Sequence, residues 1–194
     1  MIVVFDLSGV VFSNGLKTAV KKISEEFNLE PEIVEDVLNG QFSKKYRMGE
    51  VSSSEFWKSA ESSLKVGNID MLRQIFFDSY CIKDDSVKLI KELRNNDVKV
   101  AFLSNSPEDR VNYLDEKYKF ISLFDFGLFS FQAHAWKPDP EMFEEFLKRF
   151  GLKPNEIIYI DDKEENLVPA KKLGMRTILF EDAAQLKRVV QNWI

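Results

Sequence analysis

The stretch Ile2-Val3-Val4-Phe5-Asp6-Leu7-Ser8-Gly9-Val10 decides the fold class of this chain. Its opening apolar run, from Ile2 to Phe5, is typical of a short buried strand. A carboxylate at the carboxyl end of such a strand, here Asp6, lies where open α/β sheets place their ligands. Gly9 allows the backbone to turn sharply and to approach a bound group closely. Taken alone, Asp6 is better explained as a turn or capping aspartate, so its function depends on the other polar clusters of the sequence.

Further apolar runs along the chain predict the other strands of the same sheet. They cover residues 98–103, 124–129, 157–160 and 176–180. Segments with helical spacing separate the later runs, and one of them has Met142, Phe143 and Phe146 on a single face. The alternation of strand and helix predicts an α/β fold with a parallel sheet and helices on both of its faces.

Residues 14–83 break this alternation, because they contain helical patterns and no convincing strand. The patterns run from Leu16 to Phe27, from Ile33 to Leu38, from Phe56 to Leu64 and from Met71 to Phe76. We therefore expect a core domain of residues 1–13 and 84–194 and a helical cap subdomain of residues 14–83. An insert directly after the first strand lies above the ligand edge of the sheet, where it can act as a lid.

The composition is that of an acidic globular protein. The 194 residues are 44% apolar and carry a net charge of −5, without the basic surface that a nucleic-acid-binding protein needs. Cys81 is the only cysteine, which excludes an intrachain disulfide, and its apolar neighbours predict a buried thiol. The apolar start is too short for a signal peptide or a membrane span. We expect a cytoplasmic monomer or dimer with no nucleic-acid or membrane partner.

A second polar cluster, Ser104-Asn105-Ser106-Pro107, follows the apolar run 98–103. Ser106 is predicted to cap the next helix, with Pro107 in its first position and Asp109 as the acid of a capping box. Ser104 and Asn105 come earlier, at the end of the strand and beside a helix N-terminus suited to binding an anion. Anion binding and ordinary turn chemistry explain Ser104 equally well.

A third cluster contains Lys137, which stands between Trp136 and Pro138-Asp139-Pro140. A lysine is usually a solvated surface residue. The flanking rings restrict this one, and an ammonium group in a fixed position can neutralise a phosphate or a reacting carboxylate.

Asp161 and Asp162 form a fourth cluster, directly after the apolar run 157–160. Adjacent carboxylates repel each other unless a cation or a donor compensates. A hard divalent ion such as Mg²⁺ meets that need. Glu164 and Glu165, by contrast, are explained as the acidic first turn of a helix.

These four clusters, in this order, resemble the motifs of the haloacid dehalogenase-like hydrolase superfamily over nearly the whole chain. Asp6 is similar to the family's aspartate that closes the first strand. Ser104 and Lys137 resemble its second and third motifs, and Asp161 and Asp162 its acidic fourth motif. The helical stretch resembles the cap of the group whose insert follows the first motif. The resemblance implies a three-layer, Rossmann-like core with a parallel sheet and a helical cap.

Most members of this family are Mg²⁺-dependent phosphatases, and the resemblance implies that chemistry here. Asp6 would attack the phosphorus of a small phosphorylated substrate and form an aspartyl-phosphate, which water then hydrolyses. The groups that would hold Mg²⁺ are Asp6, the main-chain carbonyl of Ser8, Asp162 and, directly or through the other ligands, Asp161. The groups that would stabilise the phosphoryl oxygens are Lys137, Ser104 and the main-chain amide of Asn105.

Ser8 departs from the phosphatase pattern, in which a second aspartate two residues after the nucleophile acts as general acid and base. A serine hydroxyl has no titratable proton near neutral pH, so three interpretations stay open. The first is a phosphatase that tolerates Ser8, with a good leaving group such as a sugar 1-phosphate or an acyl phosphate. The second is a non-catalytic phosphate- or metal-binding regulator. The third is a 2-haloacid dehalogenase, which Ser8 and the intact pair of Asp161 and Asp162 oppose.

Substrate selection is expected to depend on the cap and on the loop after Asp6. The candidates in these segments are Asn14, Lys17, Lys44, Lys45, Tyr46 and Arg47. Ordinary solvation is the alternative explanation for such charged residues.

Overall fold

The computed structural model describes residues 1–191, in which five parallel strands form one sheet in the order β3-β2-β1-β4-β5. The strands are β1 (Ile2–Phe5), β2 (Lys99–Ser104), β3 (Phe126–Phe129), β4 (Ile157–Asp161) and β5 (Arg176–Leu179). The prediction of a parallel α/β sheet is confirmed. Each predicted apolar run contributes one of these strands.

β1 is the central strand, and this explains why the polar clusters meet at its end. Phe5 lies opposite Phe102 of β2 on one side and opposite Ile160 of β4 on the other. The amide of Asp6 then donates to the carbonyl of Ile160 (2.8 Å). The carboxyl ends of these three parallel strands therefore lie side by side, at the edge where such sheets bind ligands.

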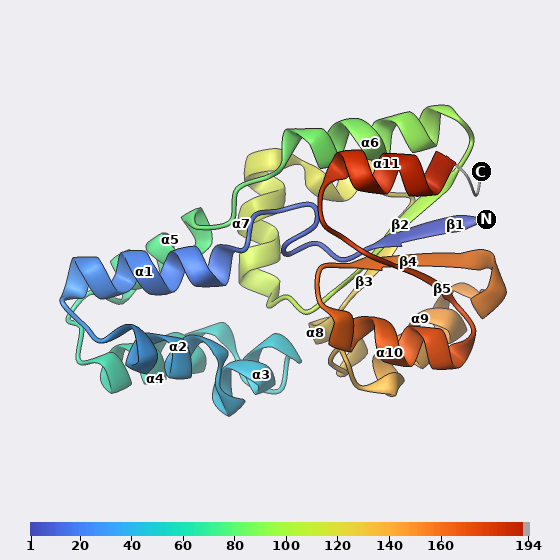
Figure 1. Cartoon of the computed structure of the whole chain (residues 1–194). Helices are drawn as coiled ribbons and strands as arrows, with labels where there is room; N and C mark the ends of the chain where they lie inside the picture. Colours follow the sequence, from blue (N-terminus) through green and yellow to red (C-terminus); the bar gives the residue numbers. More distant parts are fainter. Residues whose placement is uncertain (192–194) are drawn as a thin grey trace.

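Helices cover both faces of the sheet (Figure 1). One face packs against α6 (Asp84–Asn95), α7 (Glu108–Tyr118) and α11 (Ala183–Gln191), and the other against α9 (Pro140–Phe150) and α10 (Glu164–Leu173). Alternate residues of β1 supply the two cores, because successive side chains of a strand point to opposite faces. Val3 and Phe5 belong to the first core, and Ile2 and Val4 to the second. Among residues 1–191, no helix is both long and apolar enough to cross a membrane.

The segment between β1 and α6 is helical, as predicted, and lies beyond the carboxyl ends of the strands (Figure 1). We call it the helical region. Its helices are α1 (Gly15–Phe27), α2 (Pro31–Asn39), α3 (Gln41–Arg47), α4 (Ser53–Leu64) and α5 (Ile69–Asp78). The sequence patterns did not predict α3, which is short and has no continuous apolar face. Tertiary packing holds it, since the Tyr46 ring stacks on Phe56 with centroids 4.2 Å apart. We propose that residues 14–83 form a separate cap subdomain.

The prediction of a capping box at the start of α7 is wrong. Pro107 is the N-cap residue, and no side chain of residues 1–191 caps this helix. The Asp109 carboxylate instead accepts hydrogen bonds from Tyr46, Ser53 and Trp57 of the helical region. The Asp109 carboxylate therefore bonds to residues far away in the sequence, and not to the start of its own helix as the local pattern predicted.

The prediction of a buried thiol at Cys81 is also wrong, because this cysteine is exposed. Its neighbour Tyr80 is buried (3% exposed) and points inward instead. In an irregular connection, apolar neighbours do not fix the direction of the side chain between them.

Candidate active site

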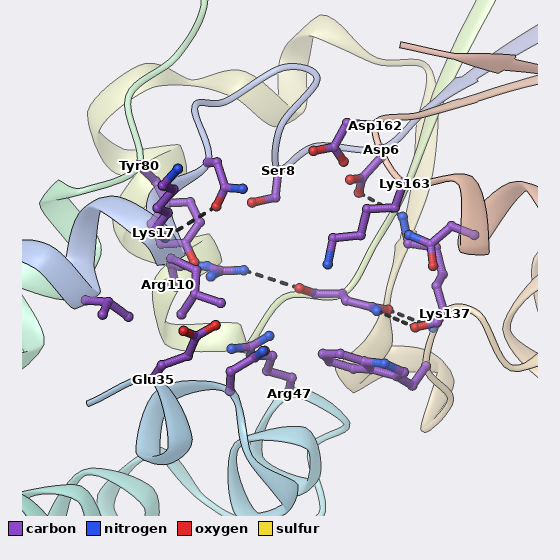
Figure 2. Close-up of a pocket in the computed structure, with 17 residues that line it drawn as sticks. Asp6, Ser8, Lys17, Glu35, Arg47, Tyr80, Arg110, Lys137, Asp162 and Lys163 are labelled. Atoms are coloured by element: carbon purple, nitrogen blue, oxygen red, sulfur yellow. Dashed lines mark hydrogen bonds and ion pairs between the residues drawn. The ribbon is translucent and has the colours of Figure 1, made fainter. Parts of the chain in front are cut away.

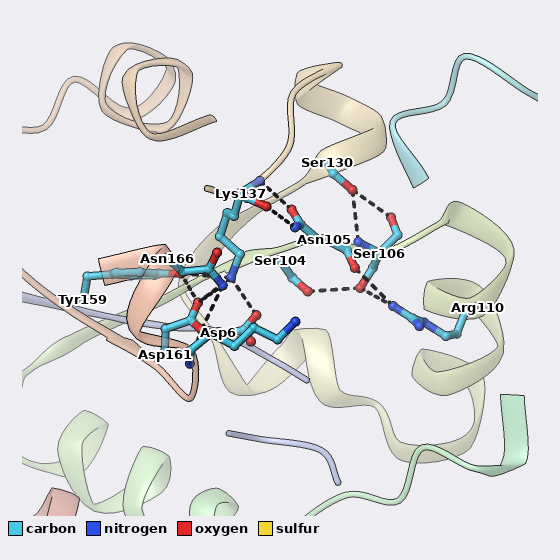
Figure 3. Close-up of polar contacts among 11 residues, drawn as sticks. Asp6, Ser104, Asn105, Ser106, Arg110, Ser130, Lys137, Tyr159, Asp161 and Asn166 are labelled. Atoms are coloured by element: carbon cyan, nitrogen blue, oxygen red, sulfur yellow. Dashed lines mark hydrogen bonds and ion pairs between the residues drawn. The ribbon is translucent and has the colours of Figure 1, made fainter. Parts of the chain in front are cut away.

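Asp6, Lys137 and Asp161 form a buried ion-pair cluster at the carboxyl ends of β1 and β4 (Figure 3). The Nζ atom of Lys137 lies 2.8 Å from Asp6 Oδ1 and 2.8 Å from Asp161 Oδ2. The three residues are only 6%, 3% and 0% exposed. A buried charge is costly unless it is paired. Here one ammonium group compensates two carboxylates.

Further donors hold Asp161 in place. Asn166 Nδ2 lies 3.0 Å from both carboxylate oxygens, and the amide of Lys163 donates to Oδ1 (3.0 Å). The hydroxyl of Tyr159 also donates to Asp161 and accepts from Lys137 Nζ (2.9 Å). Asp161 does not line the cavity described below. Its contacts thus orient Lys137 from behind the cavity wall.

Asp162, the next residue, lines the cavity together with Asp6. Its Oδ1 atom is buried and has no hydrogen-bond partner among the described residues. One oxygen from each of Asp6, Asp161 and Asp162 lies within 4.8 Å of the others. The Asp162 carboxylate packs against Gly9, where an added Cβ would lie 2.0 Å from Oδ2. An unpaired buried carboxylate oxygen beside other hard oxygen donors fits a divalent cation such as Mg²⁺.

Burial and mutual repulsion determine the protonation of these carboxyl groups. Burial raises the pKa of Asp6 to about 7, because the nearby Lys137 charge only partly offsets it. Burial likewise raises the pKa of Asp162, and the charge of Asp161 adds to the effect. Burial also tends to raise the pKa of Asp161. The charge and the hydrogen bond of Lys137 outweigh this effect and hold that pKa below its usual value. Further positive charge at this site would favour the ionised form of Asp6.

Residues at the end of β2 position the loop that carries Lys137. The Asn105 side chain forms two hydrogen bonds with the Lys137 backbone. Its Nδ2 atom donates to the Lys137 carbonyl (2.9 Å), and its Oδ1 atom accepts from the Lys137 amide (3.0 Å). Ser104 is fully buried (0% exposed), and its Oγ lies 3.0 Å from Ser106 Oγ. Ser104 does not line the cavity. Of the predicted site residues, those on the cavity wall are Asp6, Ser8, Asn105, Lys137 and Asp162.

A cavity of about 430 Å³ lies between the edge of the sheet and the helical region (Figure 2). Asp6 and Asp162 line it at the ends of the strands. Lys17 of α1, Glu35 of α2 and Arg47 of α3 line it from the helical region. A space of this size between charged groups suits a small polar ligand.

The candidate specificity residues fall into two groups. Asn14, Lys17 and Arg47 line the cavity. Lys44 instead forms an ion pair with Asp139 (3.2 Å) beside a neighbouring cavity. The other candidates do not line it either: Tyr46 is buried and bonded to Asp109, and Lys45 is exposed.

The sequence reasoning missed Arg110, Tyr80 and Tyr159. Arg110 and Tyr80 line the cavity, and Tyr159 contacts the Lys137 ammonium. A hydroxyl within the apolar run 157–160 was the one available signal for Tyr159. Arg110 has no comparable signal, since a basic residue near the start of a helix is ordinary.

Comparisons with known proteins give one family. Residues 1–174 match the family described as haloacid dehalogenase-like hydrolase. An uncharacterized protein of Dictyostelium discoideum is 29% identical, over 92% of this chain and 90% of its own length. A sesquiterpene phosphatase of Aspergillus oryzae is 25% identical, over 93% of this chain and 89% of its own length. A crystal structure of a HAD family enzyme from Bacteroides thetaiotaomicron, complexed with magnesium and inorganic phosphate, shares the fold. Its TM-score is 0.76 at 22% identity, over 95% of this chain and 98% of that chain.

Proposed function

Because this chain belongs to the haloacid dehalogenase-like hydrolase family, we propose that it is a Mg²⁺-dependent phosphatase of a small phosphorylated metabolite. One observation carries the proposal. Asp6 lies 2.8 Å from the Lys137 ammonium and within 4.8 Å of oxygens of Asp161 and Asp162, on the wall of the cavity. The relative named as a sesquiterpene phosphatase supports it, as does the related fold that holds magnesium and phosphate. The single cysteine supports a cytoplasmic location.

Asp6 acts as the nucleophile in this proposal. One of its carboxylate oxygens attacks the phosphorus, the bond from phosphorus to the ester oxygen breaks, and that oxygen leaves with the bonding electron pair and takes its proton from water. Water then attacks the phosphorus of the aspartyl-phosphate, which releases inorganic phosphate and regenerates Asp6. Lys137 neutralises the phosphoryl oxygens, with the amide of Asn105 as a further donor. Ser104 stays in this set as a proposal, because it directly precedes Asn105.

Asp6, the main-chain carbonyl of Ser8 and Asp162 would hold Mg²⁺. When bound, the ion supplies positive charge that offsets the repulsion between the Asp6 carboxylate and the phosphate. Asp161 acts on this site indirectly, by holding Lys137 in place. The orphaned Oδ1 atom of Asp162 is the observation that supports the metal.

Ser8 lines the cavity where the family's phosphatases have their acid–base aspartate. Loss of a general acid–base catalyst typically costs about 10²- to 10⁴-fold in rate. The proposed substrate therefore has a leaving group that needs little protonation, such as a sugar 1-phosphate or an acyl phosphate. The same serine favours a second candidate function, a phosphate- or metal-binding regulator that has lost turnover.

Phosphate release from p-nitrophenyl phosphate, acetyl phosphate and hexose phosphates tests these functions, with Mg²⁺ or with EDTA. We expect turnover that requires Mg²⁺ and disappears in Asp6→Asn, whereas the exposed control Asp70→Asn keeps it. A silent wild type with activity in Ser8→Asp would support the regulator instead. Silence of both proteins would reject the phosphatase for these substrates, and halide release from 2-haloacids would then be measured.

A further inference from the structure

Arg47 and Arg110 are buried arginines on the cavity wall that the proposed reaction does not use (Figure 2). Arg47 is the last residue of α3, in the helical region. Arg110 lies in the first turn of α7, one of the helices that cover the sheet. Their exposed fractions are 7% and 3%. A buried guanidinium group is costly unless an anion or hydrogen-bond acceptors compensate it.

Neither guanidinium forms an ion pair within residues 1–191. Arg47 Nη2 donates to the carbonyl of Leu38 (2.6 Å), while its Nε atom is buried and has no hydrogen-bond partner among the described residues. Arg110 Nη2 donates to the Asn105 carbonyl (3.3 Å) and the Ser106 hydroxyl (2.9 Å). Burial lowers the pKa of Arg47 to about 10, and the charge of Arg110 acts in the same direction. Two like charges therefore line one cavity, and neither has an ion-pair partner among residues 1–191.

Aromatic rings and hydrogen bonds fix both arginines. The guanidinium carbon of Arg110 lies 4.1 Å from the ring centroid of Tyr80, and that of Arg47 lies 5.4 Å from that of Trp136. The Ser130 hydroxyl donates to the Arg47 carbonyl (2.6 Å) and accepts from the Ser106 amide (3.0 Å). Guanidinium groups that are already in position lose little entropy when they bind a planar or tetrahedral anion.

Exposed charges at the same cavity do not neutralise the two arginines. Lys17, Lys163 and Glu35 also line it, and all three are exposed. Glu35 is the acidic member of the three, and it forms no ion pair with either arginine within the described residues. Solvent and salt weaken the effect of these exposed groups on the two buried arginines.

Arg110 lies close to the proposed phosphoryl site. Arg110 contacts the carbonyl of Asn105, and the amide of Asn105 is the proposed donor to the phosphoryl group. An anion bound by Arg110 would therefore lie beside that group rather than at the far end of a long substrate. The cavity volume of about 430 Å³ also suits a small substrate.

We propose that Arg47 and Arg110 bind a second anionic group of the substrate, either a carboxylate or a phosphate. The substrate class is then a small phosphate ester with another negative charge close to the ester. This inference rests on the proposed phosphatase function, which it deepens. The bidentate donors of arginine match the oxygens of both kinds of anion.

The first test compares two substrates that share a nitrophenol leaving group, which needs little protonation, and differ in the second charge: 5-carboxy-2-nitrophenyl phosphate and 2-nitrophenyl phosphate. We expect kcat/KM with Mg²⁺ to favour the carboxylated ester in the wild type. The ratio is expected to fall about 10- to 100-fold in Arg47→Met and in Arg110→Met, with Arg→Lys variants in between. The control Lys45→Met removes an exposed charge from α3 and leaves the ratio unchanged. Equal kcat/KM for the two substrates in the wild type would overturn the inference.

The second test needs no catalysis. Thermal unfolding in EDTA compares the stabilisation by methylphosphonate with that by phosphonoacetate and by methylenediphosphonate. We expect one or both doubly anionic probes to raise Tm more than methylphosphonate does, and the better probe identifies the second group. The difference is expected to disappear in Arg47→Met and Arg110→Met. It is expected to shrink in the Arg→Lys variants, which decide the test if the Met variants do not fold.

The two tests separate the two proposals. If neither ester is hydrolysed and no other substrate is, the phosphatase proposal fails, and thermal unfolding alone decides the second anion site. Equal shifts of Tm by all three phosphonates in the wild type would overturn that site, whatever the activity.

Discussion

The hydroxyl of Tyr159 lies 2.9 Å from the Nζ atom of Lys137 and donates to Asp161, so one phenol joins the ammonium group to the carboxylate that orients it. Tyr159 is fully buried in β4 (0% exposed), and its ring packs edge-on against Phe143. Burial, together with the charges of Asp161 and Asp6, raises the pKa of Tyr159 well above its usual value. The hydroxyl therefore keeps its proton, and Tyr159 is a positioning residue for Lys137.

Tyr159→Phe removes this hydroxyl and keeps the ring. Lys137 retains Asp6 and Asp161 as partners, so we expect the free energy of unfolding to fall by about 1–2 kcal/mol. We expect kcat to fall more than KM rises, because the ammonium loses one of its fixed contacts. Urea denaturation and steady-state kinetics measure both effects. Tyr113→Phe removes the hydroxyl that donates to the half-buried Asp78, away from the cavity, and is the control. The same change of kcat in both variants would contradict the positioning role.

Lys137→Met leaves two buried carboxylates without their shared cation. Removing one partner of a buried ion pair costs about 3–5 kcal/mol, and we expect a loss of this size in the free energy of unfolding near pH 8. The loss should be smaller near pH 5, where Asp6 can take up a proton. The exposed pair of Lys44 and Asp139 (33% and 50% side-chain exposure) supplies the control, because Lys44→Met should cost less than about 1 kcal/mol. Equal costs for the two lysines in urea denaturation would contradict this account.

The pKa of Asp6 predicts how the stability of the metal-free protein depends on pH. That pKa is raised from 3.8 to about 7, so the folded state binds the proton more tightly than the unfolded chain does. The resulting stabilisation is complete below about pH 4 and is lost as the pH rises to about 7. Asp6→Asn does not titrate, so its stability relative to the wild type should increase across this range. Urea denaturation in EDTA at several pH values measures the difference, and parallel curves would show that Asp6 has an ordinary pKa.

Gly9→Ala places a methyl group where Asp162 now lies. Gly9 has φ +89°, and the added Cβ would lie 2.0 Å from Asp162 Oδ2, so the carboxylate must move. We expect a loss of stability of about 1 kcal/mol or more from the backbone alone. We also expect the affinity for Mg²⁺ to fall by about 10-fold or more, because changes to residues that orient a metal-binding side chain typically have effects of this size. The Mg²⁺-induced shift of Tm measures this affinity. Gly67→Ala should leave the shift unchanged, because no described residue lies within 4 Å of its added Cβ.

Periodicity predicted the fold well where a local pattern and the tertiary environment agree. The run from Ile2 to Phe5 is buried on both sides, and it forms the central strand as its continuous apolar character indicates. Gly174 ends α10 with φ +95°, which is the expected role of a glycine at a helix terminus. The start of α7 shows where local patterns fail. Asp109 fits the local pattern of a capping-box acid, but it bonds to side chains more than 50 residues away in the sequence.

The candidate site was predictable as a set of strand ends but not as a set of side-chain directions. Asp6, Asp162 and Lys137 reach the cavity as their positions indicate. Ser104 and Asp161 occupy the same strand ends, yet hydrogen bonds to Ser106 and to Tyr159 hold them behind the cavity wall. Arg47 and Arg110 share a cavity only because α3 of the helical region lies near α7, which packs on the sheet. No local sequence pattern predicts that arrangement.

The covalent intermediate on Asp6 is the most direct test of the central claim. The wild type is mixed with acetyl phosphate and Mg²⁺, quenched with acid, and treated with borohydride, which reduces an acyl phosphate to an alcohol. Mass spectrometry of the peptide that contains Asp6 should show this alcohol at Asp6 only when Mg²⁺ and substrate are both present. The peptide from Asp6→Asn should show none. Turnover without any modification at Asp6 would contradict the account, because water would then attack the substrate directly.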